Sequence, residues 1–393
     1  MIPARRERFN RQFSADRYRA FLSRVYGRTG GPIEFRLSET PCFFPAALMD
    51  RLSAAALSMV SDLLGNQAFR TAADDVVPAT FRLAHGEDRP SFVQVDFGLV
   101  ETASGLEGRL VELQAFPSLY ALQPVVAEAY TETWHLDGLG AYLGGLNSDE
   151  YVSICRRVIV GHHDPSEVVL MEVDPQHQKT LPDFILTEKT WGVRTVDVRD
   201  VECEGRRLFY RRDGRRTRIA RIYNRVIPDD LARRGAALPF DYRDDLDVEW
   251  TGGPDWFFRI SKFSIPWLRH PWVPETHYLD QLPELPRDRD NWLLKPLFSF
   301  AGGGIIFGPS DAEIDAIPPA QKRHFVLQRR VAFTPVIHTP HGATQAEIRI
   351  MLIDDAGAYR PLIALVRMGR GKMMGVDHNK GLAWVGASAA LVE

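Results

Sequence analysis

Cysteine is scarce in this chain, which has three cysteines, Cys42, Cys155 and Cys203, in 393 residues. Three cysteines cannot build a disulfide framework, and their spacing matches no zinc-binding motif. Disulfide-rich secreted folds are therefore excluded, and a reduced, cytoplasmic compartment is the prediction.

Long apolar runs and an excess of one charge are also missing. No stretch approaches the ~18 apolar residues of a membrane helix, and the basic segment 1–13 lacks the apolar core of a signal peptide. Lys plus Arg number 48 and Asp plus Glu number 51, so the net charge is −3. This balance argues against a nucleic-acid coat or a polybasic membrane binder, so we expect neither nucleic acid nor membrane as a partner.

The chain length, at ~150 residues per domain, predicts two or three lobes. Apolar periodicity predicts helices over 15–27, 46–65, 118–145 and 177–192, and strands over 91–101, 109–115, 167–173 and 193–198. The strand–helix–strand order after residue 167 is typical of a parallel α/β unit. Segment 236–290 carries few periodic signals, and the chain is rich in strands from Trp292 onward.

Nine arginines gather in segment 206–225, which reads as a hairpin turning at Asp213-Gly214. Such a segment can bind phosphate or nucleic acid. It can equally be the solvated face of an edge hairpin, where charge prevents aggregation. The balanced overall charge favours the solvated face.

A glycine-rich loop over residues 295–305 is the strongest local motif. A strand ends in Lys295, and Gly302, Gly303 and Gly304 follow before the next apolar strand. Glycines allow backbone N–H groups to close around phosphate oxygens, and a nearby ammonium offsets their charge. The alternative is an ordinary hairpin turn, because the spacing matches neither a Walker A loop nor GxGxxG.

Two carboxylates lie on the arms of the predicted hairpin 91–115. Asp96 and Glu112 each sit between apolar neighbours, and Gln114 shares the strand face of Glu112. Carboxylates facing one cleft suit Mg²⁺, which prefers hard oxygen ligands. The alternative is a pair of solvated surface carboxylates.

Basic residues cluster again near the C-terminus, in Arg367–Lys372 and in His378–Gly381. Arginine and lysine after an apolar strand can hold a phosphate or carboxylate, although a solvated loop is the alternative. His162, His163 and Asp164 could ligate a metal, but adjacent histidines before Pro165 more often lie in a solvated loop.

In their order, these motifs resemble the circularly permuted ATP-grasp ligases, in the branch of glutathionylspermidine synthase and eukaryotic-type glutathione synthetase. The resemblance implies a mixed α+β and α/β fold over roughly residues 90–385. It implies a body formed by 1–150 and 246–393, with an α/β substrate domain inserted at 151–245 and a glycine-rich lid.

The resemblance also implies ATP and Mg²⁺ as cofactors and assigns residues to them. The residues that correspond to metal ligands are Asp96, Glu112 and Gln114, and those for ATP are Lys295, Gly302, Gly303, Gly304, Leu327, Gln328 and Lys372. The residues that correspond to substrate contacts are Gln178, Arg225, Arg370 and Ser118, with Arg370 and Lys372 closest to the chemistry.

The implied reaction joins a small-molecule carboxylate to an amine through an acyl phosphate, with ADP released. Two departures from the family pattern motivate an alternative. Gln94 stands in place of the family's arginine, and Phe298–Ala301 offers no acid before the glycines. The alternative is an ATP-grasp-like nucleotide-binding protein without ligase activity. RNA binding through the arginine-rich hairpin is a third hypothesis.

Overall fold

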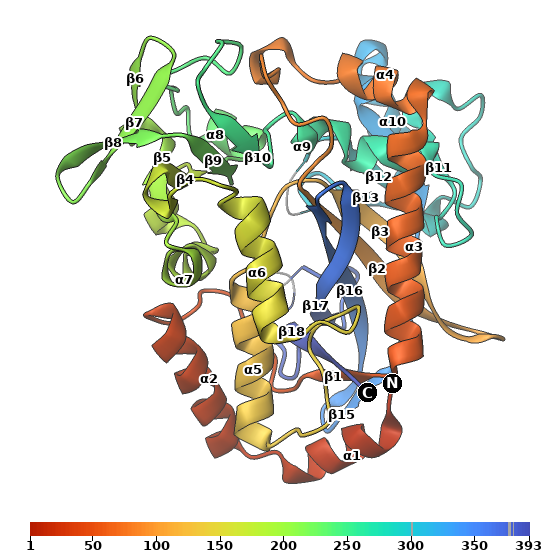
Figure 1. Ribbon diagram of the computed structural model, residues 1–393. Coiled ribbons are helices and arrows are strands. Elements are labelled where there is room, and N and C mark those ends of the chain that lie inside the picture. The colour runs from red at the N-terminus through yellow and green to blue at the C-terminus, as the bar shows by residue number, and fades with distance from the viewer. Residues whose placement is uncertain (300–301, 376–378, 380) are drawn as a thin grey trace.

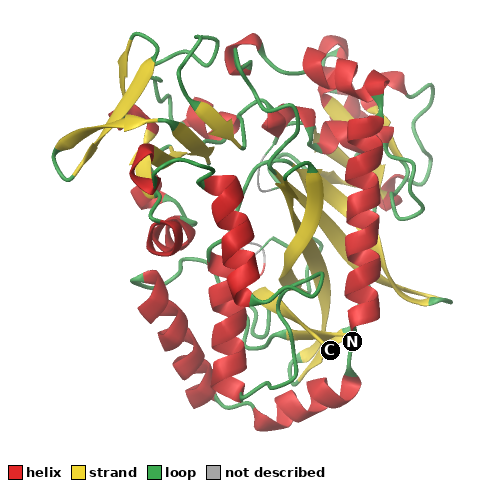
Figure 2. Cartoon of the chain, in the orientation of Figure 1, coloured by secondary structure: helices red, strands yellow, loops and turns green. Residues whose placement is uncertain are grey.

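The computed structural model describes the chain except residues 300–301, 376–378 and 380 (Figure 1). Phe300, Ala301, His378 and Lys380, which belong to two of the sequence motifs, therefore lie outside the described residues. Sheets and helices form layers, with long helices on both sides of a central large sheet (Figure 2).

The large sheet has the strand order β1-β18-β17-β16-β2-β3, and β15 pairs with β16. Its strands are β1 (Cys42–Phe44), β2 (Phe92–Thr102), β3 (Gly105–Gln114), β15 (Ile337–Thr339), β16 (Gly342–Asp355), β17 (Ala358–Gly369) and β18 (Gly386–Val392). Strands β16, β17 and β2 are buried along most of their length. They are therefore rich in apolar residues, as expected for strands covered on both faces.

Helices cover the large sheet on both faces (Figure 1). Helix α3 packs against the face that carries Val95 and Ile348, while α5 and α6 pack where Phe92 and Met351 lie. The helices of these layers are α1 (Pro3–Gln12), α2 (Ala15–Thr29), α3 (Ala46–Gly65), α4 (Gln67–Asp75), α5 (Leu122–Trp134) and α6 (Ser148–Ile159).

A parallel sheet of order β10-β9-β4-β5 follows α6 in the chain. Its elements are β4 (Val168–Glu172), α7 (Leu181–Trp191), β5 (Arg194–Asp197), β9 (Arg221–Asn224), α8 (Pro228–Arg233) and β10 (Glu249–Thr251). The strands are three to five residues long, and β4 is buried along its whole length. An antiparallel arm formed by β6 (Glu202–Glu204), β7 (Arg207–Arg212) and β8 (Arg215–Ile219) projects from it (Figure 1).

A small antiparallel sheet has the strand order β11-β14-β12-β13. It contains β11 (Thr276–Tyr278), β12 (Trp292–Pro296), β13 (Ile306–Phe307) and β14 (Phe325–Arg329), and the nearby helices are α9 (Trp256–Arg259) and α10 (Asp311–Asp315). A 3₁₀ segment, η5 (Lys262–Trp267), follows α9 and packs against β3.

Most expected elements are confirmed, with differences at helix ends. The helix expected over 46–65 is α3, whereas the helix expected over 118–145 ends at Trp134 because His135 adopts a left-handed conformation, φ 52°. The helix expected from residue 177 begins at Leu181, after a 3₁₀ turn over Pro175–His177. Helix α1 was not expected, since its sequence is mostly polar.

Residues 207–219 of the arginine-rich segment form the expected edge hairpin, whereas Arg221 belongs to the interior strand β9 and Arg225 is buried behind it. Asp213 and Gly214 have φ of 50° and 79°, as a two-residue hairpin turn requires. Arg211 and Arg216 form ion pairs with Glu202 of the neighbouring strand. Among the residues described, no helix is long and apolar enough to cross a membrane.

Candidate functional site

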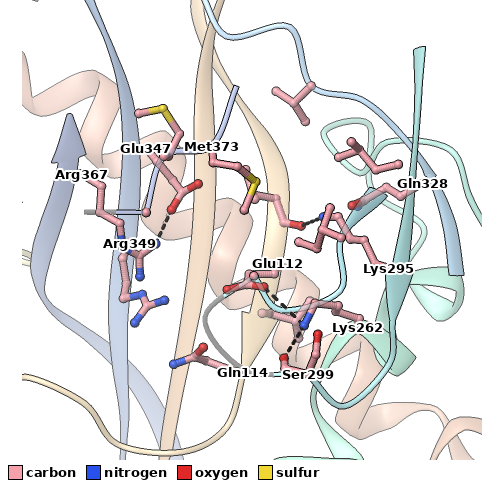
Figure 3. A pocket seen from close by; sticks show the side chains of 18 of the residues that line it. Glu112, Gln114, Lys262, Lys295, Ser299, Gln328, Glu347, Arg349, Arg367 and Met373 are labelled. Carbon is pink, nitrogen blue, oxygen red and sulfur yellow. Dashed lines mark hydrogen bonds and ion pairs between the residues drawn. The ribbon is translucent and has the colours of Figure 1, made fainter. Parts of the chain in front are cut away.

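A cavity of about 470 Å³ lies between the large sheet and the small sheet. This volume falls within the usual range for small-molecule sites. Its charged side chains are Glu112, Lys262, Lys295, Arg330, Glu347, Arg349, Arg367 and Lys372. Positive side chains outnumber carboxylates, so the lining is suited to an anionic ligand (Figure 3).

Strand register gathers the polar residues on the cavity face of the large sheet. Asp96 of β2 lies opposite both Glu112 of β3 and Arg349 of β16, and Glu347 of β16 lies opposite Arg367 of β17. Residues two apart in a strand share a face. Charged residues from four strands therefore meet on one surface.

Asp96 is fully engaged by arginine. Its two carboxylate oxygens each accept a bond of 2.6 Å from Arg349, and Arg367 adds a bond of 3.0 Å. Burial alone would raise the pKa of Asp96, which is 1% exposed, but the two guanidinium groups outweigh this and hold the pKa below its usual value. The Asp96 carboxylate therefore pairs with the two arginines and does not line the cavity.

Two glutamines extend the same network. The Gln94 side chain donates to the Ser118 carbonyl at 2.8 Å and accepts from Arg349 and from Gln114, each at 2.8 Å. Gln94 is thus a buried link between β2, β3 and β16. Gln114 and Ser118 both line the cavity.

Glu112 and Glu347 are carboxylates that line the cavity. Burial raises the pKa of Glu347, opposed by its bond from Arg367, and the carboxylates of Asp96 and Glu112 raise it further. Glu112 lies 3.9 Å from the Lys262 ammonium. The carboxylates of Asp96 and Glu112 repel the ionised form of Glu347, and a cation near Glu112 and Glu347 would relieve this repulsion.

Lys295 reaches the cavity from β12 across a β-bulge. The register of β2 and β3 shifts beside Asp96, which leaves Val111 without a partner on β2. The Val111 carbonyl accepts a 3.2 Å bond from Lys295 instead. Burial lowers the pKa of Lys295 to about 8. The carboxylate of Glu112 opposes this shift, whereas the ammonium of Lys262 adds to it.

Lys262, at the start of η5, is a second buried ammonium beside Lys295 (Figure 3). It donates to the Ser299 carbonyl at 2.8 Å. Ser299 lies at the beginning of the glycine-rich loop, so Lys262 ties this loop to the site.

The opposite part of the cavity is mainly apolar. Leu293, Ile305 and Phe307 line it beside Gln328. The Nε2 atom of Gln328 is buried and has no hydrogen-bond partner among the described residues. An apolar slot with an unpaired amide donor fits a flat heteroaromatic group that can accept a hydrogen bond.

The structure brings only part of the predicted set to the cavity. Glu112, Gln114, Ser118, Lys295, Gly302, Gln328 and Lys372 line it. Leu327 lies in the core of the small sheet, and Gly303 and Gly304 lie in the loop beyond Gly302 without lining the cavity.

Three predicted substrate residues point elsewhere. Arg370 donates to the Ala383 carbonyl at 2.9 Å and to Thr339 at 3.3 Å. The Gln178 side chain donates to Asp230 and to the Val173 carbonyl. Arg225 is buried behind the cavity wall, with its guanidinium 5.6 Å from the Phe116 ring. None of the three lines the cavity in the described part of the chain.

Sequence reasoning missed Lys262, Glu347 and Arg349. Glu347 and Arg349 alternate with apolar residues in the stretch 346–353 of β16, which is a signal that two polar residues face a site. Lys262 stands in a segment without periodicity, so only the tertiary structure identifies it.

The chain has a glutathione synthetase-like fold. One solved structure that it matches is a glutathione synthetase-like effector of Globodera pallida in its apo form, with a TM-score of 0.59 and 11% sequence identity. The match covers 96% of this chain and 95% of that chain. No protein-family model and no curated protein matches the sequence. At this identity the likeness shows the fold alone.

Proposed function

We propose that this protein is an ATP- and Mg²⁺-dependent carboxylate–amine ligase with a circularly permuted ATP-grasp fold. The observation that carries the proposal is the cavity itself, where two buried lysines and a pair of glutamates meet beside an apolar slot. A glutathione synthetase-like fold over nearly the whole chain supports it. In this proposal residues 151–245 are the inserted substrate domain.

The nucleotide would occupy the cavity along its length. Lys295, Lys262 and Lys372 would neutralise the phosphates, since all three line the cavity. Gly302 would add backbone contacts from the loop. The adenine would enter the apolar slot and accept a bond from the unpaired amide of Gln328.

Mg²⁺ would be held by Glu112 and Gln114, with Glu347 as a further ligand. The raised pKa of Glu347 supports this assignment, because a cation would stabilise its ionised form. Asp96, expected as a ligand, would instead position Arg349 and Arg367. Mg²⁺ would supply charge neutralisation on the phosphates.

Ligation through an acyl phosphate requires positioning and charge neutralisation rather than a protein nucleophile. Arg349 and Arg367, which line the cavity, would bind the substrate carboxylate and stabilise the charge that develops on it. Ser118 would add a hydrogen bond. Arg370, Arg225 and Gln178 lie outside the cavity and would contribute only if the substrate extends past it.

Calorimetric titration of ATP with Mg²⁺ tests the nucleotide site. The wild-type protein should bind, whereas Lys295→Ala should lose at least tenfold in affinity. Lys322→Ala is the control, because Lys322 does not line the cavity. Equal affinity in Lys295→Ala and wild type would refute the site, as would absence of binding in both.

A nucleotide-binding protein without ligase activity is the second candidate. Both oxygens of Asp96 are held by Arg349, and the loop residues Phe298 and Ser299 supply no acid before the glycines. Release of ADP from ATP should be measured with amines and amino-acid carboxylates in pairs. Turnover with any pair eliminates this candidate, whereas ATP binding without turnover across the screen favours it.

A further inference from the structure

A second cluster of metal-ligating side chains lies where α6 meets the edge of the parallel sheet. His162 and His163 follow the turn at Gly161, φ 64°, directly after α6, and Glu249 is the first residue of the edge strand β10. In the sequence Asp164 directly follows the two histidines, but its carboxylate accepts bonds from Ser166. The carboxylate of the cluster comes instead from Glu249, on a distant strand.

The donor atoms have the spacing of a single-ion site. The Nε2 atom of His163 lies 3.1 Å from Oε2 of Glu249, and Nε2 of His162 lies 3.8 Å from Oε1. One ligand atom from each of the three residues lies within 4.8 Å of the other two. Ligands bound tetrahedrally to Zn²⁺ are about 3.3 Å apart, so one ion could reach all three with small side-chain movements.

The carboxylate is held in place by a supporting contact. Arg221 donates through Nη1 to Glu249, and through Nε and Nη2 to the carbonyls of Ile159, at 3.1 Å, and Val158, at 2.8 Å. Burial would raise the pKa of Glu249, but His163 and Arg221 outweigh it and hold the pKa below its usual value. Outer contacts of this kind orient metal ligands in known sites.

We propose that His162, His163 and Glu249 bind Zn²⁺, with the remaining coordination position open to water. Two imidazole nitrogens and one carboxylate suit Zn²⁺ better than Mg²⁺, which prefers oxygen ligands. None of the three residues lines the cavity between the sheets. The site is therefore separate from the proposed Mg²⁺ position and independent of the proposed ligase activity.

Zinc at this position would join two parts of the molecule. Helix α6 packs against β16 of the large sheet, and Thr251 of β10 donates to the Val158 carbonyl near the end of α6 at 3.3 Å. Figure 1 shows the end of α6 beside β10. An ion bound here would cross-link α6 to the edge strand of the parallel sheet.

Full-length protein without a histidine tag should be titrated with Zn²⁺ after chelator treatment, and bound metal measured by elemental analysis. Co²⁺ should replace Zn²⁺ and give the intense visible bands of four-coordinate cobalt. We expect one equivalent to bind and to raise the melting temperature. His162→Ala and Glu249→Gln should each weaken binding at least tenfold.

His177→Ala is the matched control. His177 has the same side-chain exposure as His162, 78%, and also faces a carboxylate, Asp174. Because His162 is exposed, its replacement should leave the fold intact, which circular dichroism can verify. Retention of wild-type affinity in His162→Ala would overturn the proposal. So would equal losses in His162→Ala and His177→Ala, or no stoichiometric binding by wild type.

Discussion

Lys295 is a charged residue placed where charge is costly. Lys295 is 3% exposed, and among the residues that the structure describes its ammonium donates one hydrogen bond, to the Val111 carbonyl. Burial lowers its pKa to about 8 from 10.5. A group whose folded pKa is depressed in this way weakens the folded state at neutral pH. Such a residue is typical of a site that keeps a charge ready for an anionic ligand.

Replacement of Lys295 by methionine should stabilise the unliganded protein. Methionine fills a similar volume without a buried charge, so the free energy of unfolding at pH 7 should rise by about 1–3 kcal/mol. Nucleotide binding should disappear in the same variant. Denaturant unfolding and calorimetry measure the two effects. Loss of both stability and binding would instead identify Lys295 as a structural residue.

The pH dependence of nucleotide binding should follow the protonation of the Lys295 ammonium. The folded pKa of about 8 means that the ammonium is charged at pH 7 and mostly neutral at pH 9. ATP affinity should therefore fall about tenfold between these values, with proton uptake on binding near pH 8.

Lys295→Arg provides the comparison for this pH profile, because arginine stays charged throughout the range. Its ATP affinity should be nearly constant between pH 7 and pH 9. The same slope in wild type and Lys295→Arg would show that another group controls the profile.

At the scale of elements, helix α5 begins with a cap that comes from another helix. Its own N-cap residue, Ala121, makes no side-chain cap. The buried Asp183 of α7 instead accepts bonds from the backbone N–H groups of Leu119, at 3.1 Å, and of Ala121 and Leu122, both at 2.9 Å. Asp183 thus satisfies orphan donors and places negative charge at the helix N-terminus.

Asp183→Ala should lower the free energy of unfolding by about 2–4 kcal/mol, because three buried N–H groups lose their acceptor. Asp183→Asn keeps one oxygen and should cost less. Asp149→Ala removes an exposed acid from the first turn of α6 and should have little effect. Equal melting temperatures for Asp183→Ala and Asp149→Ala would contradict this capping role.

At the scale of the whole molecule, the cavity is formed by two separate sheets. Glu112 comes from β3 and Glu347 from β16 of the large sheet, while Lys295 and Gln328 come from the small sheet. A ligand in this cavity would contact both sheets at once. Its binding energy would therefore stabilise their association.

Hydrogen exchange with and without Mg²⁺ and ATP should detect this bridging. Amides of β3 and of β12 to β14 should exchange more slowly together when the ligand is bound, since it links the two sheets. Amides of β4 and β9 in the parallel sheet serve as the internal reference and should change little. Protection confined to one of the two sheets would contradict binding between them.

Much of the local structure follows from the sequence. Apolar periodicity predicted α3 over 46–65. The strand pattern predicted β2 within one residue of both its ends, whereas β3 begins four residues before the expected start. The turn at Asp213-Gly214 follows from residues that tolerate positive φ. These features depend on neighbours in the chain, which is why pattern and spacing are sufficient.

The sequence by itself determined α3, the strands β2 and β3, the balanced charge and the strand positions of Glu112 and Lys295. Only the tertiary structure decided that Arg349 pairs with Asp96 and that Lys262 and Glu347 line the cavity. It also decided that Arg370 donates to the Ala383 carbonyl and does not line the cavity in the described part of the chain. The physical reason is that a buried charge takes the partner that strand register and packing bring within reach, and that partner can stand anywhere in the chain.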